Sequence, residues 1–300
     1  MKPKHQGGYI GPHADLCERT LVTLLRGLGP WKHGIYLAGG LVPRYLIHEA
    51  DNSAPITPHV GTTDVDLVLD LEVLAEVDAY RRLEQNLQDL GFERGANDEG
   101  RPQHYSWRKP IETGVVVVVD LLRDAPFEQG GKAQNIPNEQ RLSALGIPGA
   151  RLVIADYIEV PITAELLDQR GTATETIRVA NIVPFVVLKA MAYEDRFEQK
   201  DAYDLIYCLE NYGTGPANVA DAFASYLRDY PDESLIPRAV EILRGRFATD
   251  SQTSGARKDG PTSYAQFLTD PGRTDLNARH RQTAAAAVEL FLKQLNEASP

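Results

Sequence analysis

Five consecutive valines at positions 115–119 constrain the fold of this chain more than any other segment. β-Branched side chains favour strands, and an uninterrupted short apolar run indicates a buried strand. Asp120 follows the valines directly, and Leu121 and Leu122 come next. A buried strand seldom holds a lone carboxylate without a partner. The run therefore predicts a central strand whose Asp120 meets other polar groups, the alternative being an aspartate that faces solvent at the end of the strand.

Around this strand, helical and strand patterns alternate up to about residue 180, and the remaining patterns are helical. Strands or β-like segments are predicted at residues 34–38, 65–69, 104–108, 115–122 and 152–162, and helices at 16–28, 41–50 and 71–90. Later helices are predicted at residues 184–210, 216–228, 231–247 and 277–298, with a long polar loop at 249–275. We therefore expect an α+β fold: residues 1–180 form a small mixed sheet with flanking helices, and residues 181–300 form a helical bundle.

The composition excludes several classes of protein. The longest aliphatic run has five residues, too few for the roughly 20 that a bilayer requires, and no apolar leader follows the N-terminus. Two cysteines cannot form a disulfide framework, so we expect a cytoplasmic protein. A net charge of −11 argues against bulk electrostatic binding of nucleic acid, although residues 244–281 carry seven basic and four acidic side chains. We interpret that segment as mainly a solvated loop and leave its role open.

A glycine pair gives the first indication of chemistry. The strand-like Tyr36-Leu37-Ala38 ends in Gly39-Gly40, after which a helix is predicted from Leu41. Glycines at such a turn let backbone N–H groups approach a ligand, and a helix N-terminus favours an anion. The pattern predicts a phosphate cradle, with an ordinary tight turn as the alternative.

Two aspartates downstream strengthen this interpretation. Asp64 and Asp66 are separated by one residue in an otherwise apolar strand, so both carboxylates point to the same face. Buried carboxylates are costly unless a cation lies between them, and Mg²⁺ prefers such oxygen ligands. If the valine strand is adjacent, Asp120 completes a cluster able to hold two metal ions. The alternative is a surface strand end at which Asp64 caps the turn after Thr62-Thr63.

This arrangement resembles the nucleotidyltransferase fold shared with DNA polymerase β: a glycine pair opening a helix, a D-x-D strand and a distal aspartate. The C-terminal half contains Lys189, Arg196, Lys200, Asp201 and Asp204 in the pattern K-x₆-R-x₃-K-D-x₂-D. That pattern is similar to the helical motif of AbiEii-type nucleotidyltransferase toxins, which belong to bacterial toxin–antitoxin and abortive-infection systems. Without the resemblance, a solvated helix face is the favoured interpretation of these cationic positions.

The resemblance implies an enzyme that uses Mg²⁺ to transfer a nucleoside monophosphate from an NTP and releases pyrophosphate. Asp64 and Asp66 would bind both metals, and Asp120 would bind the catalytic metal and help to deprotonate the acceptor. Lys189 and Arg196 would neutralise the charge of the triphosphate, and Lys189 would also be a catalytic residue. The other implied nucleotide-binding residues are Gly39, Gly40, Thr63, Lys200, Asp201 and Asp204. The family often has Ser or Thr after the glycine pair, where this chain has Leu41, so Arg44 is the expected substitute.

By the same resemblance, the acceptor would be RNA, plausibly a tRNA 3′ end, and an antitoxin would restrain the enzyme; no membrane is implied. Two alternatives stay open. One is an adenylyltransferase for an antibiotic or a protein hydroxyl, and the other is a non-catalytic binding relative, which intact carboxylates disfavour. The histidines show no metal-binding spacing, and His59 and His104 are interpreted as structural. Neither the preferred NTP nor the oligomeric state follows from the sequence.

Overall fold

A computed structural model describes residues 3–9, 11–48, 55–71, 77–96, 100–112, 115–136, 139–270 and 272–298. The chain divides into two compact units. The sheet unit comprises Ile10–Val42 and Gly61–Asn181, and the helical unit comprises Met1–Tyr9, Pro43–Val60 and Ile182–Pro300. The chain thus passes into the helical unit close to the boundary expected from the sequence. Two earlier segments of the first 180 residues also belong to the helical unit.

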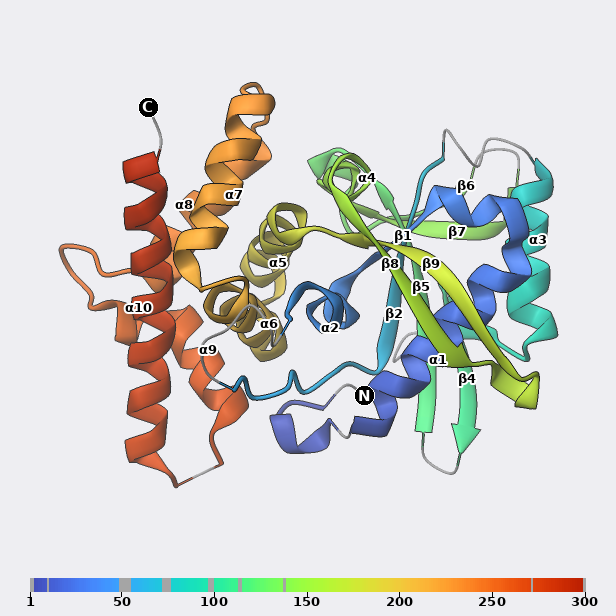
Figure 1. Ribbon diagram of the computed structural model, residues 1–300, viewed down its shortest axis with the longest axis horizontal. Helices are drawn as coiled ribbons and strands as arrows, with labels where there is room; N and C mark the ends of the chain where they lie inside the picture. The colour runs from blue at the N-terminus through green and yellow to red at the C-terminus, as the bar shows by residue number, and fades with distance from the viewer. Residues whose placement is uncertain are drawn as a thin grey trace. The chain divides into compact units, whose positions relative to one another are not determined.

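The sheet unit is a mixed α/β structure (Figure 1). Its elements in chain order are α1 (Gly11–Leu28), β1 (Ile35–Ala38), β2 (Asp64–Leu69), α3 (Val77–Asp89), β3 (Glu93–Ala96), β4 (Pro102–Glu112), β5 (Val115–Asp124), β6 (Ala133–Ile136), β7 (Glu139–Ile147), α4 (Arg151–Ala155), β8 (Tyr157–Glu165) and β9 (Thr172–Ala180). Within the described residues, nine strands form one sheet with the order β3-β4-β5-β2-β1-β9-β8, and β7 pairs with β5 and β6. The pairs β2–β5, β5–β7 and β1–β9 are parallel and the others are antiparallel. The predicted mixed sheet with flanking helices is therefore present.

The valine run forms β5, and its two faces differ in burial. Val117, Val119 and Leu121 are at most 2% exposed, whereas Val116 is 43% exposed and Asp120 is partly exposed. Successive side chains of a strand point to opposite faces. Because α1 packs against β2, β5 and β9 and buries its leucines, this helix covers the face of the buried residues. The other face of β5, which carries Asp120, stays partly exposed.

Several predicted elements of this unit need correction. Residues 152–162 are not one β-like segment, because α4 ends at Ala155 and β8 begins at Tyr157. Strands β3, β6, β7 and β9 were not expected. Strand β9 alternates exposed and buried side chains, and one of the buried residues is Glu175, so it lacks a continuous apolar run. In the predicted helix 71–90, α3 covers Val77–Asp89, and residues 72–76 lie outside the described residues.

The helical unit contains α2 (Pro43–Leu46), α5 (Ile182–Arg196), α6 (Gln199–Asn211), α7 (Pro216–Asp229), α8 (Leu235–Phe247), α9 (Asp259–Leu268) and α10 (Thr274–Ala298). Helix α10 packs against α6, α7, α8 and α9, and α5 packs against α6, α7 and α8. Aromatic rings fill the core, for example Phe223 against Phe291 with ring centroids 5.1 Å apart. The expected helical bundle is therefore present, and α9 lies inside the segment predicted as a loop.

The predicted single helix at residues 184–210 is wrong, because the chain breaks between α5 and α6. Phe197 has a φ of 53°, a left-handed conformation that interrupts an α-helix. The two helices pack against each other after this reversal. The lysine and arginine of α5 consequently face the aspartates of α6 across a helix pair instead of following one stripe.

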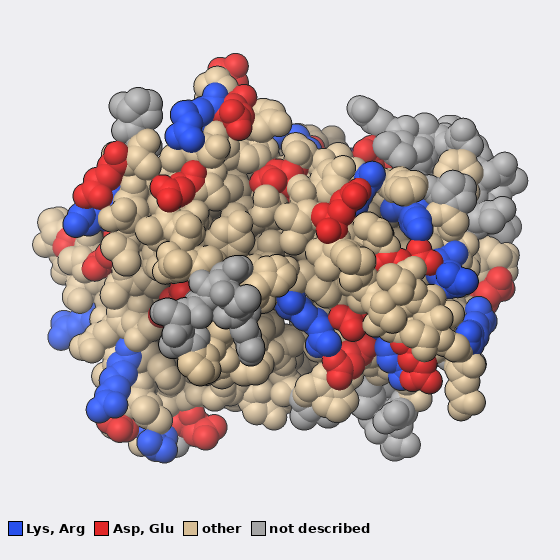
Figure 2. All heavy atoms as spheres, viewed as in Figure 1, with Lys and Arg blue, Asp and Glu red and all other residues tan. Residues whose placement is uncertain are grey.

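Basic and acidic side chains are interspersed on the face shown in Figure 2, as far as its residues are described. The described part of that face therefore has no continuous basic surface. Among the described helices, none is both long and apolar enough to cross a membrane.

Candidate active site

Two neighbouring strands of the sheet unit bring the candidate metal-binding carboxylates to one face. Asp64 and Asp66 lie two positions apart in β2 and therefore point the same way. The parallel pairing of β2 with β5 sets Asp66 directly beside Asp120, and sets Asp64 beside Val118. Side chains at paired positions of adjacent strands share a face of the sheet. The three carboxylates are thus neighbours on the partly exposed face of β5.

The burial of the strand fixes this orientation. Val65 and Leu67 are 0% exposed and point into the opposite face, so a slip of one residue would bury both aspartates there. Asp64 is itself 5% exposed, while Asp66 is partly exposed. The apolar residues between the acids therefore hold the acids on the accessible side.

Gly39 lies against the carboxylate of Asp66. Ala38 pairs with Asp66 across β1 and β2, and Gly39 follows with a φ of 71°. A Cβ atom placed on Gly39 would lie 1.7 Å from Asp66 Oδ2. Only a glycine fits this position, both because of its φ and because of the carboxylate. The glycine turn and the D-x-D strand are therefore parts of one site.

The helix expected after the glycine pair is largely absent. Gly39–Leu41 forms a 3₁₀ turn, and α2 spans only Pro43–Leu46. Residues 49–50 of the predicted helix lie outside the described residues. A helix dipole thus contributes little here, so any anion bound at the turn would depend on backbone N–H groups. Arg44, the expected substitute for a family hydroxyl, is an exposed residue of α2 in the helical unit.

The approach to the D-x-D strand is fixed from α1. Gly61 has a φ of 84°, and a Cβ on it would lie 2.9 Å from the Cβ of Ala14. The buried thiol of Cys17 donates to the carbonyl oxygen of Thr62 at 3.7 Å. Burial, together with the charges of Asp64 and Asp66, raises the pKa of this thiol. Cys17 is therefore a neutral support beneath the carboxylates, which the sequence did not reveal.

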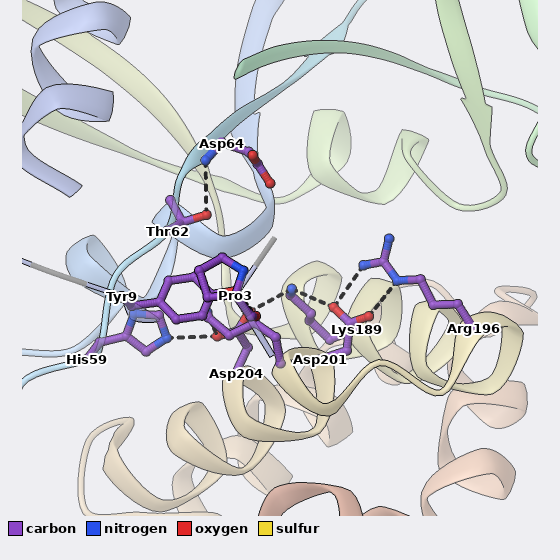
Figure 3. A network of polar contacts seen from close by, with 10 residues as sticks. Pro3, Tyr9, His59, Thr62, Asp64, Lys189, Arg196, Asp201 and Asp204 are labelled. Atoms are coloured by element: carbon purple, nitrogen blue, oxygen red, sulfur yellow. Dashed lines mark hydrogen bonds and ion pairs between the residues drawn. The ribbon is translucent and has the colours of Figure 1, made fainter. Parts of the chain in front are cut away.

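Both threonines of this approach contact Asp64. The Asp64 backbone N–H donates to Thr62 Oγ1 at 3.3 Å, as Figure 3 shows, and Thr63 Oγ1 donates to Asp64 Oδ1 at 3.2 Å. The hydroxyl of Thr63, a predicted nucleotide-binding residue, is thus directed to the carboxylate. The two hydrogen bonds restrict the orientation of Asp64.

The donor chemistry of the cluster suits Mg²⁺, because hard oxygen ligands are what this ion prefers. Paired positions on β2 and β5 put Asp66 and Asp120 within the reach of one cation. Within the described parts of the chain, however, no group of three or more His, Cys, Asp or Glu side chains is already closed around a metal position. The carboxylates fit the ion by donor type and by strand register.

In the helical unit, the residues of the K-x₆-R-x₃-K-D-x₂-D pattern pair with one another (Figure 3). Lys189 Nζ donates to Asp201 Oδ1 at 2.9 Å and to Asp204 Oδ2 at 2.7 Å. Arg196 forms a bidentate pair with Asp201 at 2.6 and 2.9 Å, and Lys200 pairs with Asp204. Lys189 is 8% exposed and Asp204 is 0% exposed. The pattern therefore builds a buried ion-pair network that joins α5 to α6.

The pKa values in this network follow from burial and pairing. Burial alone would lower the pKa of Lys189, but Asp201 and Asp204 raise it above its usual range. Burial would likewise raise the pKa of Asp204, but Lys189 and Lys200 hold it well below its usual range. Both partners are thus kept charged. Contact of Lys189 or Arg196 with a triphosphate stays a prediction, since their described partners are these aspartates.

His59 also belongs to the network. Its Nε2 lies 2.8 Å from Asp204 Oδ1, and its ring lies between Tyr203 and Tyr207 at centroid distances of 5.1 and 4.9 Å. Burial and the charge of Lys200 lower the pKa of His59 to about 4, so the ring is neutral at pH 7 and donates to the carboxylate. This buried ring agrees with the structural interpretation of His59.

The carboxylate cluster is the candidate active site of the chain. No protein-family model, curated protein or solved structure matches this chain. On one partly exposed sheet face, Asp64, Asp66 and Asp120 can bind a divalent cation or accept a proton. In the helical unit, Asp201 and Asp204 are instead neutralised by Lys189, Lys200 and Arg196.

Proposed function

We propose that this protein is a Mg²⁺-dependent nucleotidyltransferase that transfers a nucleoside monophosphate from an NTP to a hydroxyl group and releases pyrophosphate. We further propose that the sheet unit has the nucleotidyltransferase fold. One observation carries the proposal: Asp66 pairs with Asp120 across β2 and β5 while its carboxylate presses against the backbone of Gly39. A glycine turn and carboxylates from two strands are what in-line transfer from a polyphosphate needs.

Each residue of the cluster has a role in this proposal. Asp64, Asp66 and Asp120 would hold Mg²⁺, which when bound offsets the negative charge of the polyphosphate. Gly39 and Gly40 would offer backbone N–H groups to the phosphates. Asp66 lies next to that turn, so it would contact the metal on the triphosphate side, whereas Asp120 lies on the next strand.

The proposed step is balanced within the substrates. A bond forms between the acceptor oxygen and the α-phosphorus, and the bond between the α-phosphorus and the bridging oxygen of the pyrophosphate breaks. The acceptor proton passes to the carboxylate of Asp120, which then releases it to water.

The nature of the acceptor rests on the helical motif. Its similarity to AbiEii-type toxins supports an RNA acceptor, such as a tRNA 3′ end, and a cognate antitoxin as partner. Within this proposal, Lys189, Lys200, Asp201 and Asp204 stabilise α5 against α6. Arg196 is the member of the network with an exposed side chain, 51% of it accessible, so it is the member we propose for phosphate binding.

The test is transfer of label. The purified protein is incubated with Mg²⁺, each α-labelled NTP in turn, and total RNA, a protein mixture or aminoglycosides. We expect label in RNA from at least one NTP, and we expect Asp64→Asn, Asp66→Asn and Asp120→Asn to abolish it while the variants stay folded. Asp89→Asn is the matched control, because Asp89 is an exposed residue of α3 that accepts a hydrogen bond from Gln85.

The outcomes separate the alternatives. Label in protein or in the small molecule would replace RNA as the acceptor but keep the enzyme class. Transfer at the normal rate by any of the three carboxylate variants would exclude that residue from the metal site. No transfer to any acceptor by the unmodified protein, with each NTP, would refute the proposal in favour of a non-catalytic role.

A further inference from the structure

The sheet face that carries the carboxylates continues beyond Asp120 onto β4, the next strand (Figure 1). Antiparallel pairing of β4 with β5 sets Ser106 directly opposite Asp120 and Arg108 opposite Val118. Opposed residues of neighbouring strands share a face. Ser106 and Arg108 therefore lie on the same face as the three carboxylates.

Arg108 carries a positive charge on the same sheet face as the three carboxylates, but it does not form an ion pair with them. Its Nε and the Oγ of Ser106 each lie 3.1 Å from the point that a Cβ on Gly95 would occupy. The side chain thus leans over Gly95 of β3, on the side of β4 away from Asp120. Arg108 is exposed, and within the described residues no carboxylate forms an ion pair with it. A guanidinium stays charged at any physiological pH, so it can bind an external anion.

The order of residues across the sheet indicates which anion Arg108 would bind. Ala38 of β1, Asp66 of β2, Asp120 of β5 and Ser106 of β4 occupy successive paired positions across the sheet, and Gly39 directly follows Ala38. In an in-line displacement the attacking and leaving oxygens lie on opposite sides of the phosphorus. This inference rests on the proposed function, in which the triphosphate binds at the Gly39–Gly40 turn. The acceptor then approaches from the side of Asp120, over β4.

We infer that Arg108 binds a backbone phosphate of a polynucleotide acceptor, next to the hydroxyl that is attacked. Three carboxylates repel an acceptor phosphate, and one exposed guanidinium on the same face offsets that repulsion. An acceptor without a phosphate, such as a protein hydroxyl or an antibiotic, would need no such cation and would be repelled by it if it were itself basic. The planar guanidinium also matches a phosphate by forming two parallel hydrogen bonds.

The first experiment measures binding alone. A short RNA with a 5′ fluorophore and a free 3′ hydroxyl is titrated with the full chain by anisotropy, without NTP. We expect Arg108→Ala to weaken binding about tenfold or more and to lower the slope of log affinity against log salt by about one. Arg108→Gln should behave like Arg108→Ala. Arg170→Ala, at the exposed turn before β9, is the matched control and should bind as the unmodified protein does.

A substituted RNA locates the contact. A methylphosphonate, which lacks the charge, is placed in turn at each linkage near the 3′ end. At one linkage the unmodified protein should lose the same affinity that Arg108→Ala loses, and the variant should lose little more. Equal losses for protein and variant at every linkage, or unchanged binding by Arg108→Ala, would overturn the inference. Failure of the unmodified protein to bind RNA would overturn it as well.

Transfer assays keep this test separate from that of the proposed function. Arg108→Ala should raise the KM for RNA while leaving NTP affinity within about twofold, since the triphosphate lies on the other side of the carboxylates. Active transfer with an unchanged KM for RNA refutes the inference alone. Absence of transfer by the unmodified protein, with RNA binding that depends on Arg108, refutes the proposed function and leaves the phosphate contact standing.

Discussion

Gly39→Ala tests the contact between the glycine turn and the carboxylates. The substitution has two costs. A residue with a Cβ at a φ of 71° loses about 1–2 kcal/mol. The added Cβ would also lie 1.7 Å from Asp66 Oδ2 and 2.9 Å from Asp66 Cβ, so rotation of the carboxylate alone cannot relieve the clash. Displacing a packed strand in this way costs about 1–3 kcal/mol. We therefore expect the free energy of unfolding to fall by about 2–5 kcal/mol.

Gly29 provides a matched control. It has a φ of 58°, and a Cβ there would meet no atom within 4 Å. Gly29→Ala should lose only the conformational cost of about 1–2 kcal/mol. Urea unfolding of both variants gives the difference, and label transfer should fall only in Gly39→Ala, because that variant alone moves the carboxylate of Asp66.

A second background makes the test sharper. Asp66→Ala removes the carboxylate atoms that the added Cβ would meet, although the Cβ of residue 66 remains. In that background, Gly39→Ala should therefore lower the free energy of unfolding by less. A double-mutant cycle measures this coupling, which we expect to be at least about 0.5 kcal/mol for groups in contact. Equal destabilisation by Gly39→Ala and Gly29→Ala, with additive effects in the Asp66→Ala background, would refute the described geometry.

The buried network of the helical unit gives two further predictions. Lys189→Ala leaves Asp201 and Asp204 without their shared cation and should lower the free energy of unfolding by about 3–5 kcal/mol. The control, Lys293→Ala at an exposed position of α10, should lower it by less than about 0.5 kcal/mol. An unchanged stability of Lys189→Ala would refute the network, and NTP titration of folded Lys189→Ala tests whether Lys189 also contacts a triphosphate. The pKa of His59 is about 4 in the folded chain, below its usual 6.5, so the stability that the neutral ring contributes is complete above pH 6.5 and is lost as the pH falls toward 4. We expect the stability difference between the unmodified protein and His59→Gln to shrink by roughly 2 kcal/mol from pH 7 to pH 5 in urea unfolding, and a difference that does not change with pH would contradict a neutral buried ring.

The sheet unit shows how far patterns of residues can predict a fold. The valine run and the D-x-D segment predicted β5 and β2, because a short apolar run interrupted by acids has few alternatives. That Asp66 pairs with Asp120 depends on the register of two strands far apart in the sequence, which no local pattern encodes. Strand β9 was missed for a related reason. Its sequence alternates mostly polar and apolar residues, and only the pairing with β8 distinguishes such a segment from an exposed loop.

The helical unit shows a different limit. The residues at 184–210 have helical periodicity throughout and contain no glycine and no internal proline beyond the first turn, so nothing in them indicates a break at Phe197. The tertiary packing of α6 against α5 imposes the reversal. The same reversal turns a row of predicted phosphate ligands into partners for aspartates, because Lys189 comes to face Asp201 and Asp204 only when the helix is broken.

The spacing of the K-x₆-R-x₃-K-D-x₂-D pattern can thus be explained by structure before any ligand is considered. Lys189 neutralises two aspartates that are at most 1% exposed, and a buried carboxylate requires such a partner. This requirement alone would select a lysine on one helix and two aspartates on the next. Arg196 differs, since about half of its side chain stays accessible after pairing with Asp201. If the motif also binds nucleotide, Arg196 is the residue that would do so. Arg196→Lys would keep a positive charge beside Asp201 but lose the bidentate geometry of the guanidinium. A defect in NTP affinity with little loss of stability would therefore separate binding from folding within one motif.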